Sequence, residues 1–469
     1  MSILSSSSSS GISNPERPVN NCLCKITKID TAKSYGFLKR EFWLAGFTYF
    51  LFIFSLFSIT GVEFAVIALY LLAAYHRLRS KPEEYLPRWI VVPFLLWVAA
   101  LFLSALTNPD PLSNLATLRH QYRILLPFVL LPALAQVNLE RLLKVYLIVA
   151  AVMAVYGVSQ SIFAFDLYRS PGDHQFAPIF PGFPNMQIYR ARGNFAGPGS
   201  FANHMMMVGL LCISIFFSAR GKTRHWWALG AAITAMGLLA SFGRSAWIGM
   251  FVGLLVLSLR LPRRWAVTVV VTGCVLLGAT AMLIESGWLA RHSSGNVQSA
   301  VIVRLTTSGS ANDQSAARLA LWQAGLRAIK DHPLLGVGFK NRAAFRPYMG
   351  DIPWQIRKHI PSYNIGADLH NIYLQIAFDL GLLGLAAYLA MWGVVFFWNA
   401  TWIARACEEF RLEAGVLWGT TAALTGAIVD GFFHDSFFSG NANATILMFM
   451  GLSFFAGLRI KNQLRDAEA

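Results

Sequence analysis

The feature that most restricts this chain is a series of apolar stretches, each close to the ~20 residues that a helix needs to cross a bilayer. Twelve can be marked in the 469 residues, at 42–59, 61–75, 89–106, 122–137, 143–162, 200–218, 226–241, 245–259, 265–284, 371–398, 414–433 and 442–458. Only 13% of the residues are charged, against roughly 25% in soluble domains. The sequence therefore predicts an all-α polytopic membrane protein with about 12 transmembrane helices.

Lysine and arginine in short loops indicate the orientation of such a chain, because they are enriched on the cytoplasmic side. With a cytoplasmic amino terminus, four basic segments fall inside. They are 76–81, 220–224, 260–264 and the tail that contains Arg459, Lys461 and Arg465. The reversed orientation would export all four, so we expect both termini to be cytoplasmic. The net charge of +16 then belongs at a membrane surface, and membrane lipids rather than nucleic acid are the expected partners.

This orientation divides the chain into five parts. We expect a disordered cytoplasmic tail at 1–40, transmembrane helices 1–9 at 41–284, a large outer loop at 285–369, transmembrane helices 10–12 at 370–460, and a second cytoplasmic tail at 461–469.

The sequence of the large outer loop is too regular for an unstructured linker. Apolar residues recur with helical periodicity over 316–330, and this helix should end before Pro333. The loop holds ten lysine and arginine residues against five acidic ones, which indicates an anionic partner. We predict a partly helical loop between transmembrane helices 9 and 10.

Four polar residues lie at the outer ends of predicted helices, although they are far apart in sequence: Arg192, Arg244, Arg318 and His370. Arginine stays charged and donates paired hydrogen bonds to phosphate, so converging arginines can bind a diphosphate and stabilise its charge. His370 could remove a proton from an acceptor hydroxyl as a general base. The chain has no Asp-x-Asp motif and no acid and histidine cluster with metal-ligand spacing, so we expect neither a metal nor another cofactor.

Each of these residues also has a purely structural interpretation. Arg192 and Arg244 can mark helix ends by reaching into the headgroup region. Arg318 can lie on a solvated helix face, and His370 can cap or pack. Further candidates for a supporting role, with a solvated turn as the alternative for the last two, are Trp322, Asp368, His434 and Asp435.

Several segments together resemble the signature of the O-antigen ligase and polymerase superfamily. They are 192–198, 241–244, 318–322, 332–338, 369–374 and 381–385. The resemblance covers about residues 190–390, and it rests on the order and spacing of the segments rather than on any single one.

The resemblance implies a glycosyltransferase of the bacterial inner membrane with a periplasmic active site. A glycan on undecaprenyl diphosphate would be transferred to a lipid A–core acceptor sugar, without a metal and with inversion at the anomeric carbon. Arg192, Arg244 and Arg318 would bind the diphosphate, and His370 would activate the acceptor hydroxyl. The single large outer loop before His370 favours an O-antigen ligase.

Other functions stay open. An O-antigen polymerase of the same superfamily would extend the lipid-linked glycan, and a protein O-glycosyl ligase would transfer it to serine or threonine. A transporter belongs to a different class, for which ionisable residues near the bilayer midplane and internal repeats are typical. The predicted helix centres hold few charges, and we find no convincing internal repeat in the sequence.

Overall fold

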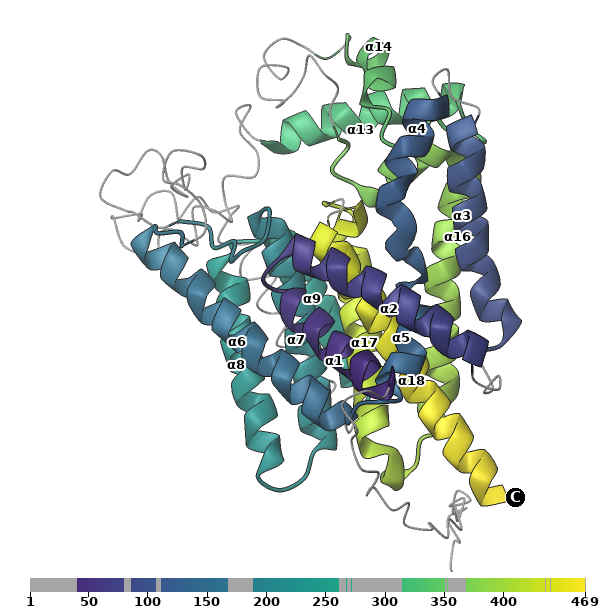
Figure 1. Cartoon of the computed structure of the whole chain (residues 1–469). Coiled ribbons are helices and arrows are strands. Elements are labelled where there is room, and N and C mark those ends of the chain that lie inside the picture. Colours follow the sequence, from purple (N-terminus) through teal and green to yellow (C-terminus); the bar gives the residue numbers. More distant parts are fainter. Residues whose placement is uncertain are drawn as a thin grey trace, which may run out of the picture.

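The computed structural model (Figure 1) describes residues 40–79, 86–106, 111–167, 189–260, 267, 271, 314–350, 352, 368–434, 436–438 and 440–468. Every element longer than one residue in this part of the chain is a helix, which confirms the predicted all-helical class there. The amino-terminal tail, most of the stretch 265–284, and residues 285–313 and 353–367 of the outer loop lie outside the described residues.

The helices follow in chain order. They are α1 (Arg40–Phe54), α2 (Ile59–Arg79), α3 (Arg88–Leu106), α4 (Pro111–Leu118), η1 (Arg119–Leu125), α5 (Leu126–Leu134), α6 (Leu139–Phe163), α7 (Pro198–Ser218), α8 (Thr223–Ala240), α9 (Arg244–Ser258), α13 (Gln314–Asp331), η2 (Arg342–Phe345), α14 (Arg346–Met349), α16 (Ile372–Ile403), η4 (Glu408–Phe410), α17 (Arg411–Asp430), η5 (Ser436–Phe438) and α18 (Gly440–Glu468).

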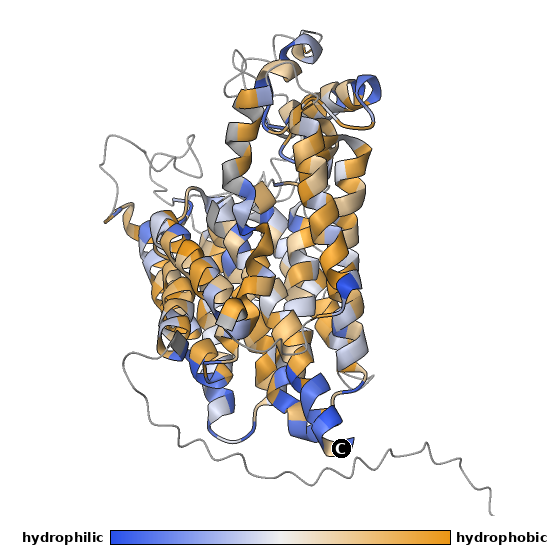
Figure 2. Cartoon of the chain, turned by 45° about the vertical axis from the view of Figure 1, so that its right-hand side comes forward, coloured by the Kyte–Doolittle hydropathy of each residue, from blue (hydrophilic) through white to orange (hydrophobic). Residues whose placement is uncertain are grey.

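Seven of these helices have the length and apolar composition to cross a membrane: α2, α3, α6, α7, α16, α17 and α18. Large apolar side chains such as Phe64, Ile148 and Leu229 are more than half exposed on the flanks of the bundle. Figure 2 shows these flanks as mainly hydrophobic and the end near the carboxyl terminus as hydrophilic. An exposed apolar surface of this extent fits a bilayer, so the chain is a polytopic membrane protein. The count of twelve spans stays a prediction.

Two predicted segments differ from the helices observed. The stretch 122–137 is not one helix, because the short 3₁₀ helix η1 precedes α5, which carries Pro127 in its first turn and Pro132 further on. Proline has no N–H to donate and disrupts a continuous α-helix. The predicted cytoplasmic tail 461–469 continues as helix α18 as far as Glu468.

The predicted start of the tenth transmembrane helix at His370 is also wrong. Helix α16 begins at Ile372, because the side chain of Asn371 accepts hydrogen bonds from the N–H groups of Tyr373 and Leu374 at 3.0 and 3.1 Å. An asparagine in this position caps a helix by satisfying its first free donors. His370 therefore lies in the loop just before the cap.

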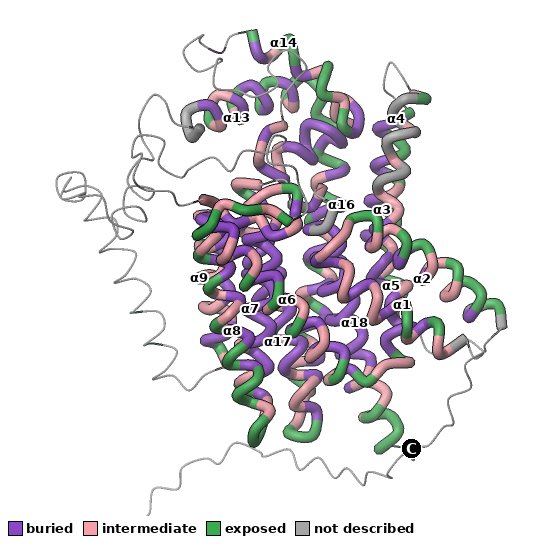
Figure 3. The backbone as a smooth tube through the Cα atoms, turned by 60° about the vertical axis from the view of Figure 1, so that its left-hand side comes forward, coloured by how far each residue is buried: buried purple, intermediate pink, exposed green. Residues whose placement is uncertain are grey.

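Helices α7, α17 and α18 form the buried centre of the bundle (Figure 3). Glycines permit close packing around them. A Cβ on Gly249 of α9 would lie 2.6 Å from the carbonyl oxygen of Gly426 on α17, and a Cβ on Gly426 would lie 2.9 Å from that of Gly249. Small residues at such crossings let two membrane helices approach until their backbones touch.

Helix α16 is interrupted at Gly381, where φ is +67° and ψ is −172°. The segment 333–338, which follows α13, fills this break. Its N–H groups at Val337 and Gly338 donate to the carbonyls of Phe378 and Asp379 at 2.9 and 3.0 Å. In return, the N–H groups of Leu382 and Leu383 donate to carbonyls at Pro333 and Leu334. Backbone groups freed by the break are thus paired, as an apolar environment requires.

The two ends of the bundle differ in what they carry. Helices α13 and α14 lie beyond one end, and the carboxyl terminus lies at the other (Figure 1). Arg220 after α7 pairs with Glu408 before α17 at 3.0 Å, and Arg459 of α18 pairs with Glu413 at 3.1 Å. These basic residues from separate helices therefore gather at the end opposite α13.

Candidate functional site

The first turn of α7 is the place where distant segments of the chain meet. Three contacts define it: Phe201 with Gly193, Ala202 with Gly243, and Gly199 with His434. Each glycine lies so close to its partner that an added Cβ would overlap it. The loop before α7, the turn between α8 and α9, and the end of α17 therefore surround the amino terminus of α7.

Arg192 lies in the loop between α6 and α7, and its side chain is largely buried. Its Nη2 is 3.1 Å from Oδ2 of Asp166, and the two side chains are 12% and 6% exposed. The backbone N–H groups of Arg192 and Gly193 donate to the side-chain oxygen of Gln160 at 3.2 and 2.8 Å. Gly193 has a φ of +54°, a conformation that favours glycine. The loop is thus fixed on the end of α6, with Asp166 as the charge partner of Arg192.

Arg244 is the first residue of α9, directly after the tight turn that ends α8. In this turn the hydroxyl of Ser241 donates to the carbonyl of Leu238 at 2.5 Å and accepts from the N–H of Gly243 at 3.1 Å. Arg190 donates from Nε to the carbonyl of Ser241 at 3.1 Å. The loop that carries Arg192 and the turn that carries Arg244 are therefore joined directly.

His370 lies in a short loop whose backbone is held on both sides. Its φ is +50°, in the left-handed region that few residues with a Cβ adopt. Before it, the N–H of Leu369 donates to the side-chain oxygen of Gln375 at 2.9 Å. After it, the N–H of Ile372 donates to the carbonyl of Gly431 at 2.8 Å. The half-buried His370 is thus tied to α16 and, through Gly431, to the end of α17.

Helix α13 confirms the helix predicted at 316–330, and it is attached to the same loop. The indole Nε1 of Trp322 donates to the carbonyl of Leu369 at 2.9 Å. Arg318, half-buried, lies one turn earlier on α13. An apolar cluster fastens this helix to α14 and α16, and it consists of Ala317, Leu321, Ala324, Ala328, Phe345, Met349, Ile352, Leu369 and Phe378.

Polar pairs stabilise the rest of the loop around α13. Both carboxylate oxygens of Asp368 accept hydrogen bonds from Arg342, at 3.0 and 2.6 Å. Tyr348 donates to Asp331 at 2.9 Å, and burial, followed by this hydrogen bond, raises the pKa of Tyr348. Asp368 therefore supports the loop through Arg342, two residues away from His370.

The remaining predicted candidates have separate outcomes. His434 packs on Gly199 at the start of α7. Asp435 lies outside the described residues. Among the residues that the structure describes, no three His, Cys, Asp or Glu side chains are grouped as metal ligands would be.

Two polar residues at this end of the molecule were not predicted from the sequence. Gln160 and Asp166 lie at and beyond the end of α6, and they hold the backbone and the guanidinium of Arg192. The one signal for Gln160 is a polar side chain near the end of an apolar stretch. Asp166 carries no signal of its own, because its partner is 26 residues further along the chain.

Together these features define a polytopic helical membrane protein in which loops bearing arginine and histidine are joined at one end of the bundle. Residues 229–389 match the family model of the O-antigen ligase. This match confirms the resemblance of the segment to the O-antigen ligase superfamily, and it indicates a glycosyltransferase-like membrane enzyme. It includes Arg244, Arg318 and His370, whereas Arg192 precedes it. No curated protein matches the chain.

Proposed function

We propose that this protein is an O-antigen ligase that transfers a glycan from undecaprenyl diphosphate to a lipid A–core sugar. The observation that carries the proposal is the convergence described above. The loop of Arg192, the turn of Arg244 and the end of α17 surround the first turn of α7. Gly431 joins α17 to the loop of His370, and Trp322 joins that loop to α13, the helix of Arg318.

The reaction assigns a different task to each kind of residue. His370 accepts the proton of the acceptor hydroxyl as its oxygen forms a bond to the anomeric carbon of the glycan. The bond between that carbon and the diphosphate oxygen breaks, and the diphosphate leaves with the electron pair. Arginine side chains stabilise the charge that develops on this oxygen. Attack opposite the leaving group inverts the anomeric carbon.

The ion pair of Arg192 with Asp166 gives the three arginines different roles in binding the donor diphosphate. Asp166 already neutralises Arg192 and orients its guanidinium in a largely buried position. A donor diphosphate would compete with this carboxylate. We therefore assign most of the diphosphate binding to Arg244 and Arg318, and a smaller share to Arg192.

The same proposal places the site on the periplasmic side of the bacterial inner membrane. Arg220, just after α7, and Arg459 of α18 lie at the end opposite α13, as expected of a cytoplasmic side. The carboxyl terminus is at that end as well (Figure 1). On this topology α13 and its loop face the periplasm, where a lipid-linked glycan and a lipid A–core acceptor are both accessible.

Purified full-length protein in detergent, given an undecaprenyl-diphosphate glycan and lipid A–core, tests the proposal. We expect a product of lipid A–core plus glycan, with release of undecaprenyl diphosphate and no requirement for added metal. Extension of the lipid-linked glycan without use of lipid A–core would identify a polymerase instead. Transfer to a serine-containing or threonine-containing protein would identify a protein ligase, and no transfer to any acceptor would overturn the proposal.

A further inference from the structure

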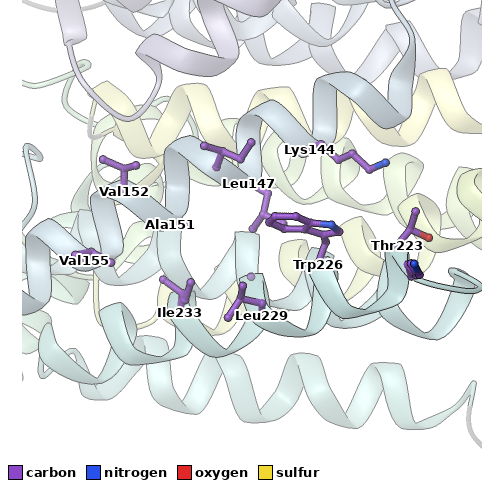
Figure 4. A pocket seen from close by; sticks show the side chains of 12 residues that line it. Lys144, Leu147, Ala151, Val152, Val155, Thr223, Trp226, Leu229 and Ile233 are labelled. Carbon is purple, nitrogen blue, oxygen red and sulfur yellow. The ribbon is translucent and has the colours of Figure 1, made fainter.

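A second feature lies at the other end of the bundle, on the outer flank of α6 and α8. A groove with a volume of about 620 Å³ runs between these two helices (Figure 4). Its floor is closed where Gly230 of α8 touches Leu147 of α6 so tightly that a Cβ would overlap the leucine. The groove is separate from the candidate site, because the loop of Arg192 is held at the carboxyl end of α6.

The groove has one polar end and one apolar end. Figure 4 shows Lys144 and Thr223 at one end and Val152, Val155 and Ile233 at the other. The distance from Lys144 to Val155 along α6 is about 16 Å at ~1.5 Å per residue. That is about half of the ~30 Å hydrocarbon core of a bilayer. The groove therefore has the length of one acyl chain in one leaflet.

The walls of the groove are apolar and open to the surroundings. Ile148 and Val152 of α6 are 58% and 54% exposed, and Trp226 and Leu229 of α8 are 61% and 52% exposed. Trp226 lies toward the polar end (Figure 4), the position in which tryptophan side chains settle at a membrane interface.

The polar end carries an excess of positive charge. Lys144 is 2.6 Å from Glu140, and both side chains remain more than a third exposed, so the lysine keeps access to solvent. Lys222 lies exposed at the start of α8 and also lines the groove. Arg224 extends over the ring of Phe216 at 4.2 Å, beside the same helix end. Among the described residues, Glu140 pairs with Lys144, and no acidic side chain is paired with Lys222.

We propose that this groove binds an anionic phospholipid, with an acyl chain along α6 and α8 and its phosphate between Lys144 and Lys222. Basic pockets between membrane helices recognise anionic headgroups in this way. The site uses neither the glycan donor nor the acceptor. On the topology proposed above, the lipid belongs to the cytoplasmic leaflet.

Native mass spectrometry of the full-length protein with phosphatidylglycerol or phosphatidylcholine of identical acyl chains tests this site. We expect phosphatidylglycerol to be retained in preference, and the Lys144→Gln, Lys222→Gln double variant to weaken its retention about tenfold. A Lys461→Gln, Arg465→Gln variant removes the same charge from the far end of α18, and it should retain phosphatidylglycerol like the wild type. Equal retention of both lipids, or equal losses in both variants, would overturn the proposal.

A phosphatidylglycerol with a photoreactive group in its acyl chain locates the bound lipid. We expect labelled peptides from α6 and α8, including Val152, Val155 or Ile233. The variant Ile233→Trp fills the apolar end, so it should reduce this labelling while the protein keeps its melting temperature. Labelling confined to other helices, or crosslinks that show a second copy of the chain in the groove, would contradict a lipid site.

Discussion

The indole of Trp322 donates a hydrogen bond to the carbonyl of Leu369 at 2.9 Å, so a helix of the outer loop is tied to the residue that precedes His370. The donor of this hydrogen bond is the indole N–H of Trp322, and the acceptor is the backbone carbonyl of Leu369. Residues 322 and 369 are 47 positions apart. The link therefore couples the position of α13, with Arg318, to that of His370.

Replacement of Trp322 with phenylalanine removes this donor and keeps an aromatic ring. We expect kcat of glycan transfer to fall about tenfold, because a loosely held loop misplaces the reacting groups, and stability to fall by about 1 kcal/mol. Steady-state transfer assays and thermal unfolding measure the two effects. Trp43→Phe, at an exposed tryptophan of α1, is the matched control. An equal effect in both variants would show that the hydrogen bond of Trp322 to Leu369 is not the cause of the loss.

Replacement of Asp166 with alanine leaves the largely buried Arg192 without its carboxylate. We expect a loss of about 3 kcal/mol in stability, as for other buried pairs broken on one side. The double variant Asp166→Ala, Arg192→Ala should lose less, because it removes the uncompensated charge as well. Denaturant unfolding of both variants and of Arg192→Ala measures this coupling, and strictly additive losses would show that the two residues do not stabilise each other.

Replacement of Arg318 with alanine tests the proposed donor site on α13. We expect KM for the lipid diphosphate donor to rise about tenfold, since one charge-assisted contact to phosphate contributes roughly 1.5–3 kcal/mol. KM for the acceptor should stay nearly constant. Lys330→Ala removes an exposed cation from the last turn of the same helix and should leave both values unchanged. A rise in donor KM of the same size in both variants would indicate general charge attraction by the loop.

The sequence predicts the helices well because apolar length is a local property of the chain. The helix at 316–330 and most membrane helices follow from that pattern. The interruption of α16 does not, because the backbone at Gly381 is satisfied by the segment 333–338, which lies more than 40 residues earlier. Arg192 and His370 could be marked as candidates from their positions at helix ends. The partner Asp166 could not, because an ion pair depends on folded geometry.

Replacement of His370 with glycine separates a catalytic role from a structural one. The φ of +50° suits glycine better than any residue with a Cβ, so the substitution relieves backbone strain of about 1 kcal/mol. We expect the melting temperature to be kept or raised while glycan transfer is lost, because no base remains. Transfer at the wild-type rate in a folded His370→Gly protein would refute the assignment of His370 as the base.

Replacement of Gly381 with alanine tests the interlocked break in α16. A Cβ at this position would overlap the backbone of Leu334, and the φ of +67° is unfavourable for alanine. The segment 333–338 would have to leave the break, which exposes the carbonyls of Phe378 and Asp379 that it satisfies. We expect a loss of at least about 3 kcal/mol in stability, or failure to fold.

Gly393→Ala in the same helix has open space around its Cβ and should be neutral or stabilising by about 0.5–1 kcal/mol. Thermal unfolding of both variants in detergent gives the comparison. Similar melting temperatures would show that the segment does not depend on the break, and hydrogen exchange at Val337 and Gly338 would then report whether their hydrogen bonds persist.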